Sequence, residues 1–241
     1  MNDPFSLGRS VLGAEILCYR LGEGPETTLF LGSHHGNEPH GPVMVRRLME
    51  LLDGDASLLA DRAAVFVPTL NPDGLSANTR RNARGVDLNR NLPTRDWQPY
   101  AGEDDYAPGP APASEPETRA LVALVESVAP IKIVTIHAPL HCVNWNGLSR
   151  DEAALLPSAG LRRVLWEGRP AVCVEELGAA MAERNGYPLL SDVGYPCPGS
   201  FGTWAGFERR IATITLEVGR DCTPEAAWTE NRDALLAALD Y

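Results

Sequence analysis

The chain has 241 residues, 44% of them hydrophobic and 22% charged, which is the composition of a globular protein and argues against disorder. Its net charge of −11 disfavours nucleic-acid binding, because the chain and a phosphate backbone repel each other. No apolar run approaches the ~20 residues that a membrane-spanning helix needs. We therefore expect neither nucleic acid nor a membrane as a partner.

Two features of the sequence indicate a cytoplasmic protein. The first ten residues, MNDPFSLGRS, contain no basic segment followed by an apolar one, as a secretory signal would. The five cysteines are scattered and include no CxxC pair, which is typical of free thiols in a reducing compartment. The chain also shows no internal repeat and no clear linker, so we expect residues 1–241 to form a single domain.

The first half of the chain alternates predicted strands with a predicted helix. Residues 27–33 and 63–70 are short apolar runs, as buried strands are. Between them, residues 39–52 carry apolar side chains near helical spacing. The turn at residues 71–74, NPDG, closes the second strand. Residues 92–114 are rich in Pro, Gly, Asp and Tyr and predict a long surface loop.

The second half continues the alternation. Helices are predicted over residues 114–128, 171–186 and 224–239, and strands over residues 131–136 and 211–218. Strands that alternate with helices predict an α/β fold with a mixed, largely parallel twisted sheet covered by helices on both faces. Because ligands bind beyond the carboxyl ends of such strands, the residues that follow each strand are the first place to look for a site.

Histidines follow two of the predicted strands. All five lie in two short stretches: His34, His35 and His40, then His137 and His141. His35 and Glu38 form an HxxE pair that can bind one ion from a single turn of chain, and His137 can add a third ligand from a distant strand end. A His₂Glu set with an open fourth position is the arrangement of catalytic zinc. The alternative is that these are polar loop residues.

Arginines gather in one segment of this acidic chain. Residues 79–95 contain five arginines and a single acid, Asp87. The planar guanidinium group matches carboxylates and oxyanions, so the segment predicts an anion pocket. One arginine would stabilise a developing oxyanion and another would bind a substrate carboxylate. A solvated basic loop is the alternative.

Glu217 ends the last predicted strand, between Leu216 and Val218. A carboxyl group in such apolar surroundings is poorly solvated, and its pKa should rise toward the range of a general base. An exposed acid at a strand end is the alternative. The preceding segment at residues 194–204 is rich in Gly, Pro and aromatic residues and could cover a substrate.

In order along the chain, these segments resemble those of the zinc carboxypeptidases, the funnelin-type metallopeptidases. The resemblance runs from about residue 28 to residue 218 and rests on GSHHGNEP, NPDG, RRNARGVDLNRN, SEPET, TIHAPLHCVN and TLEV. It implies a zinc-carboxypeptidase-like catalytic domain that hydrolyses a small peptide with a free carboxylate.

The resemblance also implies which residues bind the metal. His35, Glu38 and His137 would bind one zinc ion per chain, and Asp87 would orient His35. His34 and His141 are expected outside the ligand set. His34 should point away from the site if its segment is extended, because neighbouring side chains of a strand face opposite ways.

The resemblance assigns the remaining roles in catalysis and substrate binding. Glu217 would be the catalytic base, and Arg80 would stabilise the oxyanion. Asn89 and Arg90 would bind the terminal carboxylate of the substrate. Tyr195 lies about where the family carries a tyrosine on a mobile loop, although the surrounding loop differs.

Within the family, HAPL and YPxPGSFGTW are most similar to bacterial murein tripeptide amidases. Those cytoplasmic enzymes cleave the γ-D-glutamyl–diaminopimelate bond of wall peptides during recycling. A diaminopimelate leaving group carries an extra carboxylate and an extra ammonium, so its pocket needs polar partners. The expected lining residues are His141, Asn144, Asn146, Asp192, Tyr195 and Ser200.

Three alternatives stay open. The first is an ordinary metallocarboxypeptidase acting on L-peptides. The second is an N-acyl-amino-acid amidohydrolase of the succinylglutamate desuccinylase or aspartoacylase type, which HGNE and the triplet at residues 217–219 also resemble, although NPDG and PGSFGTW argue against it. The third is a peptide-binding relative without activity, which should have lost a metal ligand or the glutamate. All of these residues are present.

Overall fold

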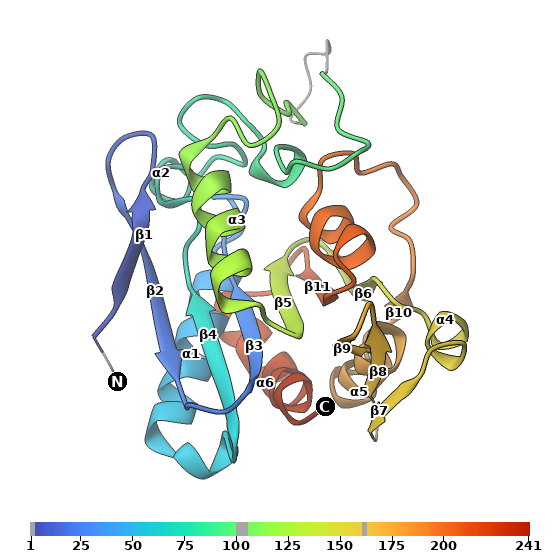
Figure 1. Cartoon of the computed structure of the whole chain (residues 1–241). Coiled ribbons are helices and arrows are strands. Elements are labelled where there is room, and N and C mark those ends of the chain that lie inside the picture. The colour runs from blue at the N-terminus through green and yellow to red at the C-terminus, as the bar shows by residue number, and fades with distance from the viewer. Residues whose placement is uncertain (1–2, 100–105, 161–162) are drawn as a thin grey trace.

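The computed structural model describes residues 3–99, 106–160 and 163–241. Its main sheet contains β1 (Phe5–Arg9), β2 (Glu15–Leu21), β3 (Glu26–Leu31), β4 (Arg62–Val67), β5 (Lys132–His137), β6 (Leu140–Asn146), β10 (Leu189–Leu190) and β11 (Ala212–Gly219). These strands lie in the order β1-β2-β4-β3-β5-β11-β6-β10 (Figure 1). The four central strands are parallel, whereas β2 and β6 pair antiparallel on either side of them. The predicted mixed, largely parallel sheet is confirmed.

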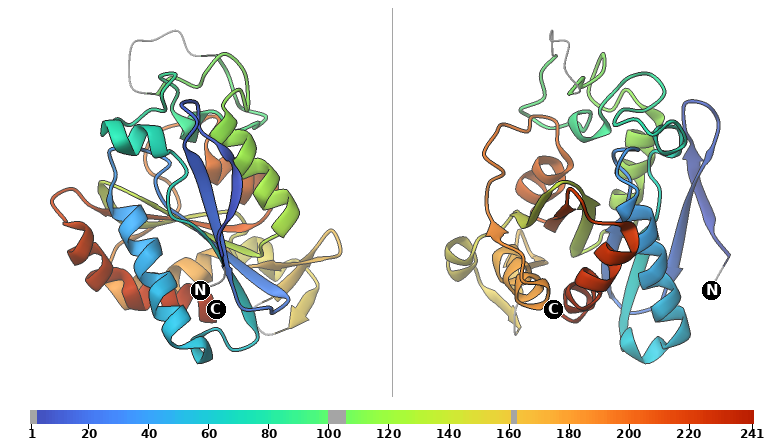
Figure 2. Two further views of the ribbon diagram at one scale, coloured as in Figure 1. Left: turned by 90° about the vertical axis from the view of Figure 1, so that its left-hand side faces the viewer. Right: turned by 180° about the vertical axis from the view of Figure 1, so that it is seen from behind.

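Helices cover both faces of the sheet, as predicted (Figure 2). On one face lie α1 (His40–Gly54), α5 (Val174–Asn185) and α6 (Pro224–Asp240), and on the other lie α3 (Pro116–Val128) and a π-helix at Gly202–Glu208. Successive side chains of the central strands point to opposite faces of the sheet, so each strand contributes to both hydrophobic cores. In β3, Phe30 is buried under the first set of helices, while Leu29 and Leu31 are buried under the second.

The carboxyl ends of the central strands meet at one edge of the sheet. There β3 leads into the loop that carries His35, and β5 ends at His137 itself. The parallel register of β5 and β11 places Glu217 opposite His137. Three segments that are far apart in the sequence therefore present polar side chains at the same edge, where α/β proteins bind their ligands.

Several elements were not predicted from the sequence. They are the strands β1, β2, β6 and β10, the helix α4 (Arg150–Ala154), and a small antiparallel sheet of β7 (Ser158–Gly160), β8 (Arg163–Trp166) and β9 (Arg169–Val172). The edge strand β1 has no buried residue, so it lacks the apolar run that identifies a central strand. The predicted helix at 171–186 begins only at Val174, because its first two residues belong to β9.

The loop predictions are partly confirmed. Residues 92–99 and 106–114 contain no helix or strand, whereas residues 100–105 lie outside the described part of the chain. The NPDG turn is the start of a short helix, α2 (Pro72–Ala77), whose first turn is capped by Asn71. No helix in the described residues combines the length and the apolar character needed to cross a membrane.

Candidate active site

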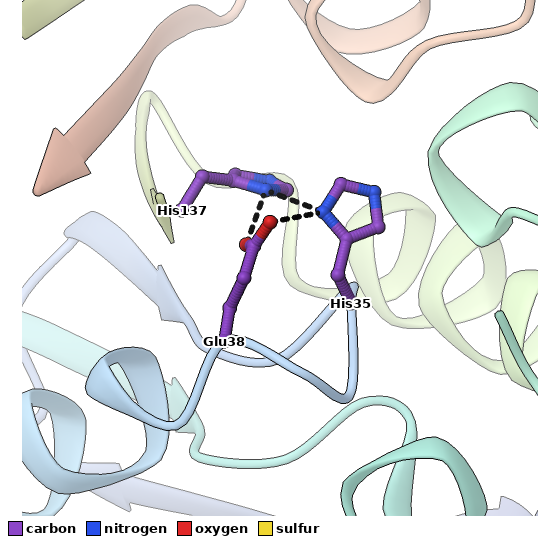
Figure 3. A group of neighbouring side chains, drawn as sticks. All are labelled: His35, Glu38 and His137. Atoms are coloured by element: carbon purple, nitrogen blue, oxygen red, sulfur yellow. Dashed lines mark hydrogen bonds and ion pairs between the residues drawn. The ribbon is translucent and has the colours of Figure 1, made fainter. Parts of the chain in front are cut away.

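Three buried side chains converge at the carboxyl edge of the sheet (Figure 3). His35 Nδ1 lies 2.8 Å from Glu38 Oε1, and His137 Nδ1 lies 3.1 Å from Glu38 Oε2. The two Nδ1 atoms are 3.2 Å apart, and one ligand atom from each residue lies within 4.8 Å of the others. Two imidazole nitrogens and a carboxylate facing one point are the donor set of a catalytic zinc site, so the residues present fit this ion.

The loop with His35 and Glu38 rests on the turn that follows β4. Asn71 Nδ2 donates a hydrogen bond to the carbonyl oxygen of His34 at 3.2 Å, and Asn71 Oδ1 accepts one from the Gly74 amide at 2.9 Å. A Cβ atom at Gly36 would lie 1.9 Å from the Gly74 carbonyl carbon, so no other residue fits there without moving the chain. The NPDG turn therefore supports the loop that presents two of the three donors.

Asp87 fixes the orientation of His35 from behind. Its Oδ1 atom lies 3.2 Å from His35 Nε2, and its Oδ2 atom accepts two hydrogen bonds from the Arg80 guanidinium at 3.0 and 3.1 Å. In the neutral imidazole, a proton on Nε2 leaves the lone pair of Nδ1 facing Glu38 and His137. The orientation of His35 therefore matches the sequence-based expectation for a metal ligand.

Carboxylates dominate the charge of this cluster. Burial would lower the pKa of His35, but the carboxylates of Glu38 and Asp87 outweigh it and raise the pKa to about 9. Burial likewise opposes ionisation of Asp87, yet His35 and Arg80 lower its pKa well below the usual range. A cation bound at the two Nδ1 atoms would replace a proton, so binding must weaken as the pH falls.

Glu217 stands on the neighbouring strand, beside the cluster. Its side chain is buried, and its Oε2 atom accepts a hydrogen bond from the Leu140 amide at 3.3 Å. Burial raises the pKa of Glu217, although His137 acts in the opposite direction. The direction agrees with the expectation from the sequence, and it favours a carboxyl group that can accept and return a proton.

One cleft of about 470 Å³ connects these groups. His35, His137 and Glu217 line it, together with four residues predicted to act on the substrate: Arg80, Asn89, Arg90 and Tyr195. The side chain of Asn89 is held by the Phe201 amide, which donates to its Oδ1 atom at 2.8 Å. Arg90 is buried and donates to the Asn89 carbonyl oxygen at 2.7 Å. The structure thus brings the predicted anion-binding residues to the predicted metal site.

Tyr106 lies between two arginines of the cleft and was not singled out by the sequence. Its ring centre is 5.0 Å from the Cζ atoms of both Arg80 and Arg90, a cation–π distance. The only signal was the richness in tyrosine of residues 92–114, and nothing local distinguished this tyrosine from the others. Contact with residues 16 and 26 positions earlier is a property of the folded loop.

Two of the remaining histidines differ from expectation in where they point. His141 was expected to line the pocket, but it does not, because its ring packs edge-on against Tyr187 with centroids 4.1 Å apart. His34 lies outside the three-residue cluster, but it does not point away. Its ring stacks on that of His137 with centroids 5.3 Å apart. The His34 segment turns sharply here, with Ser33 at φ 55°, so strand alternation does not apply.

Comparison with known proteins agrees with the geometry of this site. The profile of the zinc carboxypeptidase family matches residues 3–158. The chain is 31% identical to murein peptide amidase A of Escherichia coli K12 over 91% of its own length and 83% of that protein. It is 29% identical to murein peptide amidase A of Vibrio campbellii over 99% of its length and 88% of that protein. The chain therefore belongs to the zinc carboxypeptidase family and is a hydrolase.

Solved structures support the same fold. The chain superposes on the crystal structure of the murein-tripeptide amidase of Escherichia coli O157 with a TM-score of 0.74 and 26% identity. The match covers 100% of this chain and 93% of the amidase chain. The match to carboxypeptidase A from Helicoverpa armigera covers 99% of this chain and 68% of that chain, with a TM-score of 0.75 at 17% identity. The expected zinc-carboxypeptidase-like architecture is confirmed.

The support of the metal-site loop by the NPDG turn leads to a stability prediction. Asn71→Ala removes both hydrogen bonds of a fully buried side chain and leaves the Gly74 amide and the His34 carbonyl without these partners. We expect it to lower the free energy of unfolding by about 2 kcal/mol, measured by denaturant titration. The exposed Thr229→Ala change on α6 is the control and should cost less than ~0.5 kcal/mol. Equal losses in the two variants would contradict the role of Asn71.

Proposed function

We propose that this hydrolase uses one zinc ion to cleave the γ-D-glutamyl–diaminopimelate bond of murein tripeptides. The observation that carries the proposal is the convergence of His35, Glu38 and His137, of which both histidines line one cleft with Glu217. The similarity to murein peptide amidases over 91% of the chain supports the choice of substrate.

The chain's own groups can move the protons of an amide hydrolysis. When bound, zinc would supply Lewis-acid catalysis, which polarises the carbonyl group and favours ionisation of water. Glu217 would accept a proton from the attacking water and deliver it to the nitrogen of the leaving amine. The water oxygen bonds to the carbonyl carbon, the carbon–nitrogen bond breaks, and the products are a carboxylic acid and an amine.

Arginines would bind the negative charges. Two nitrogens of Arg80 are held by Asp87, while its Nη1 lies 3.9 Å from Glu38, so the guanidinium edge reaches the metal cluster. Arg80 can therefore donate to the oxyanion that forms during attack. Asn89 and Arg90, which line the same cleft, would bind the free carboxylate of the leaving group.

Asn144, Asn146 and Thr215, which we call the floor of the cleft, are polar and support a polar leaving group. Asn146 Nδ2 donates to Asn144 Oδ1 at 3.2 Å and to Thr215 Oγ1 at 3.4 Å, and all three residues line the cleft. Ser200 and Thr203 also line it. These amides and hydroxyls can bind the distal ammonium and carboxylate of diaminopimelate, whose burial without partners would cost several kcal/mol.

We also propose a cytoplasmic location and a single catalytic domain over residues 1–241. All five cysteines are free thiols in the structure, which supports a reducing compartment. Residues from both halves of the chain line the same cleft, which supports one catalytic unit.

Metal binding is the first test. We expect about one zinc per chain in the purified protein, lost in His137→Ala and retained in His141→Ala, by elemental analysis. The affinity for zinc should decrease as the pH falls from about 9, where His35 takes up a proton. His141 is the matched control because its ring packs on Tyr187, outside the cleft. Equal zinc content in the two variants would refute the ligand assignment.

The role of Glu217 leads to a kinetic prediction. Glu217→Gln preserves the shape of the side chain but cannot accept a proton from water. We expect kcat to fall by about 10²-fold or more while zinc content is unchanged. If Glu217→Gln retained most of the activity, Glu217 would not be the base and another carboxylate would have to accept the proton.

The two arginines should affect different kinetic constants. Arg90→Lys keeps the charge but loses the bidentate fork, so it should mainly raise KM. Arg80→Ala should mainly lower kcat, because the oxyanion exists only after attack. Converting the leaving-group α-carboxylate to an amide should mimic the loss at Arg90. If the wild-type enzyme cleaves the amidated substrate as efficiently as the acid, Asn89 and Arg90 do not bind this carboxylate.

The substrate class is tested by direct comparison of three compounds. We expect the wild-type enzyme to cleave L-Ala-γ-D-Glu-diaminopimelate far faster than a peptide ending in L-Phe, and to leave N-succinylglutamate intact, as followed by chromatography of the products. Faster release of L-Phe would make the chain an ordinary carboxypeptidase with the same metal site. Hydrolysis of N-succinylglutamate alone would identify an N-acyl-amino-acid amidohydrolase.

A further inference from the structure

Arg220 is a cation of the cleft that the proposed mechanism does not use. It lies three residues beyond Glu217, in the turn after β11, and its side chain lines the same cleft. Within residues 3–99, 106–160 and 163–241, it makes no hydrogen bond and no ion pair, and it is exposed. Arg80, by contrast, is tied to Asp87, and Arg90 is buried against the Asn89 carbonyl.

The strand β11 gives the direction of the cleft relative to the scissile bond. Thr215 pairs with Asn144 on the floor, and Glu217 stands opposite His137 at the centre. Gly219 pairs with Leu140, farther along in the same direction. A strand advances by about 3.3 Å per residue, so Arg220 lies beyond Glu217 on the side away from the floor.

Asn89, one of the two residues proposed to bind the leaving-group carboxylate, adjoins the Asn146 end of the cleft. Asn89 accepts a hydrogen bond from the Phe201 amide, and a Cβ atom on the next residue, Gly202, would lie 2.6 Å from Asn146 Oδ1. The leaving group would therefore occupy the cleft from Glu217 toward Asn146. The acyl part of the substrate would extend from Glu217 toward Arg220.

We propose that Arg220 binds a carboxylate on the acyl side of the scissile bond and so selects γ-linked acidic acyl groups. The inference rests on the proposed function. In a γ-linked glutamyl group the α-carboxylate is free and only a few bonds from the scissile carbonyl. In an ordinary α-linked peptide that carbon carries no free carboxylate, because its carboxyl group forms the scissile bond.

The charge of the cleft favours a cation at the position of Arg220. A second carboxylate on the acyl side must approach a cleft that already contains the acids Glu217 and Asp192, in a chain of net charge −11. Arg80 and Arg90 are assigned to the oxyanion and to the leaving-group carboxylate, so without a cation on the acyl side these acids would repel the acidic acyl group. The exposed guanidinium of Arg220, which has no partner among the residues that the structure describes, can form a bidentate pair with this carboxylate without giving up an interaction seen there.

Two matched substrates and two variants test the proposal. The substrates are L-Ala-γ-D-Glu-diaminopimelate and the same tripeptide with the D-Glu α-carboxylate converted to an amide. For the wild-type enzyme, we expect amidation to lower kcat/KM by about 10–100-fold, the range for a hydrogen bond to a charged group. Arg220→Gln should cause a similar loss with the first substrate, mainly through KM, and little change with the second. Arg220→Lys should restore part of the loss.

Controls separate binding from folding. Arg47→Gln, an exposed change on α1, should leave both rates unchanged. Zinc content and thermal unfolding should be the same in Arg220→Gln as in the wild-type protein. Equal losses by Arg220→Gln with both substrates, or no loss with either, would overturn the inference and leave the amidase function intact. If the wild-type enzyme cleaves neither tripeptide, the proposed function fails and the role of Arg220 fails with it.

Discussion

The buried carboxylate of Asp87 is the interaction on which the site depends. One oxygen accepts from His35 Nε2 and from the Asn89 amide, and the other accepts twice from Arg80. A single fully buried anion thus contacts His35, holds Arg80 and caps the short 3-10 helix Leu88–Arg90, which carries Asn89 and Arg90. Burial of such a charge is tolerated only because every one of these donors is present.

The same arrangement gathers cations in the cleft of an acidic chain. The chain has a net charge of −11, yet the guanidinium groups of Arg80, Arg90 and Arg220 all line one cleft. The first two are fixed by neighbours, and the third reaches solvent. Rigid cations near the reacting centre suit charge that develops during the reaction, since they need not reorganise. Arg220 has no partner in the part of the chain that the structure describes, which suits its proposed role of recognising a charge that the substrate already carries.

Tertiary contacts position the irregular loop that carries His35 and Glu38. The metal-site loop is not a helix or strand, but it is held by Asn71 and by the close approach of Gly36 to Gly74. His137 and Glu217, by contrast, are aligned by the parallel register of two buried strands. Buried hydrogen bonds thus hold the loop residues next to residues that the sheet holds, which is the kind of support that a precise site requires.

The sequence by itself determined the central strands, most of the helices and the residues that meet at their ends. Apolar runs identify buried strands, and an HxxE pair places two donors on one turn, because both patterns depend only on spacing along the chain. The resemblance to zinc carboxypeptidases, and not spacing alone, marked Asp87, Asn89 and Arg90, whereas Glu217 was marked by its apolar strand end and by that resemblance.

Only the tertiary structure decided which distant groups touch. The position of Tyr106 between two arginines, the turning of His141 onto Tyr187 and the stacking of His34 on His137 depend on loops and on contacts between segments far apart in the chain. The edge strand β1 and the strand β9 of the small sheet were likewise not predicted, since they are short, half-exposed and lack an apolar run. Local patterns encode the core, whereas the packing of surface loops is decided by the whole fold.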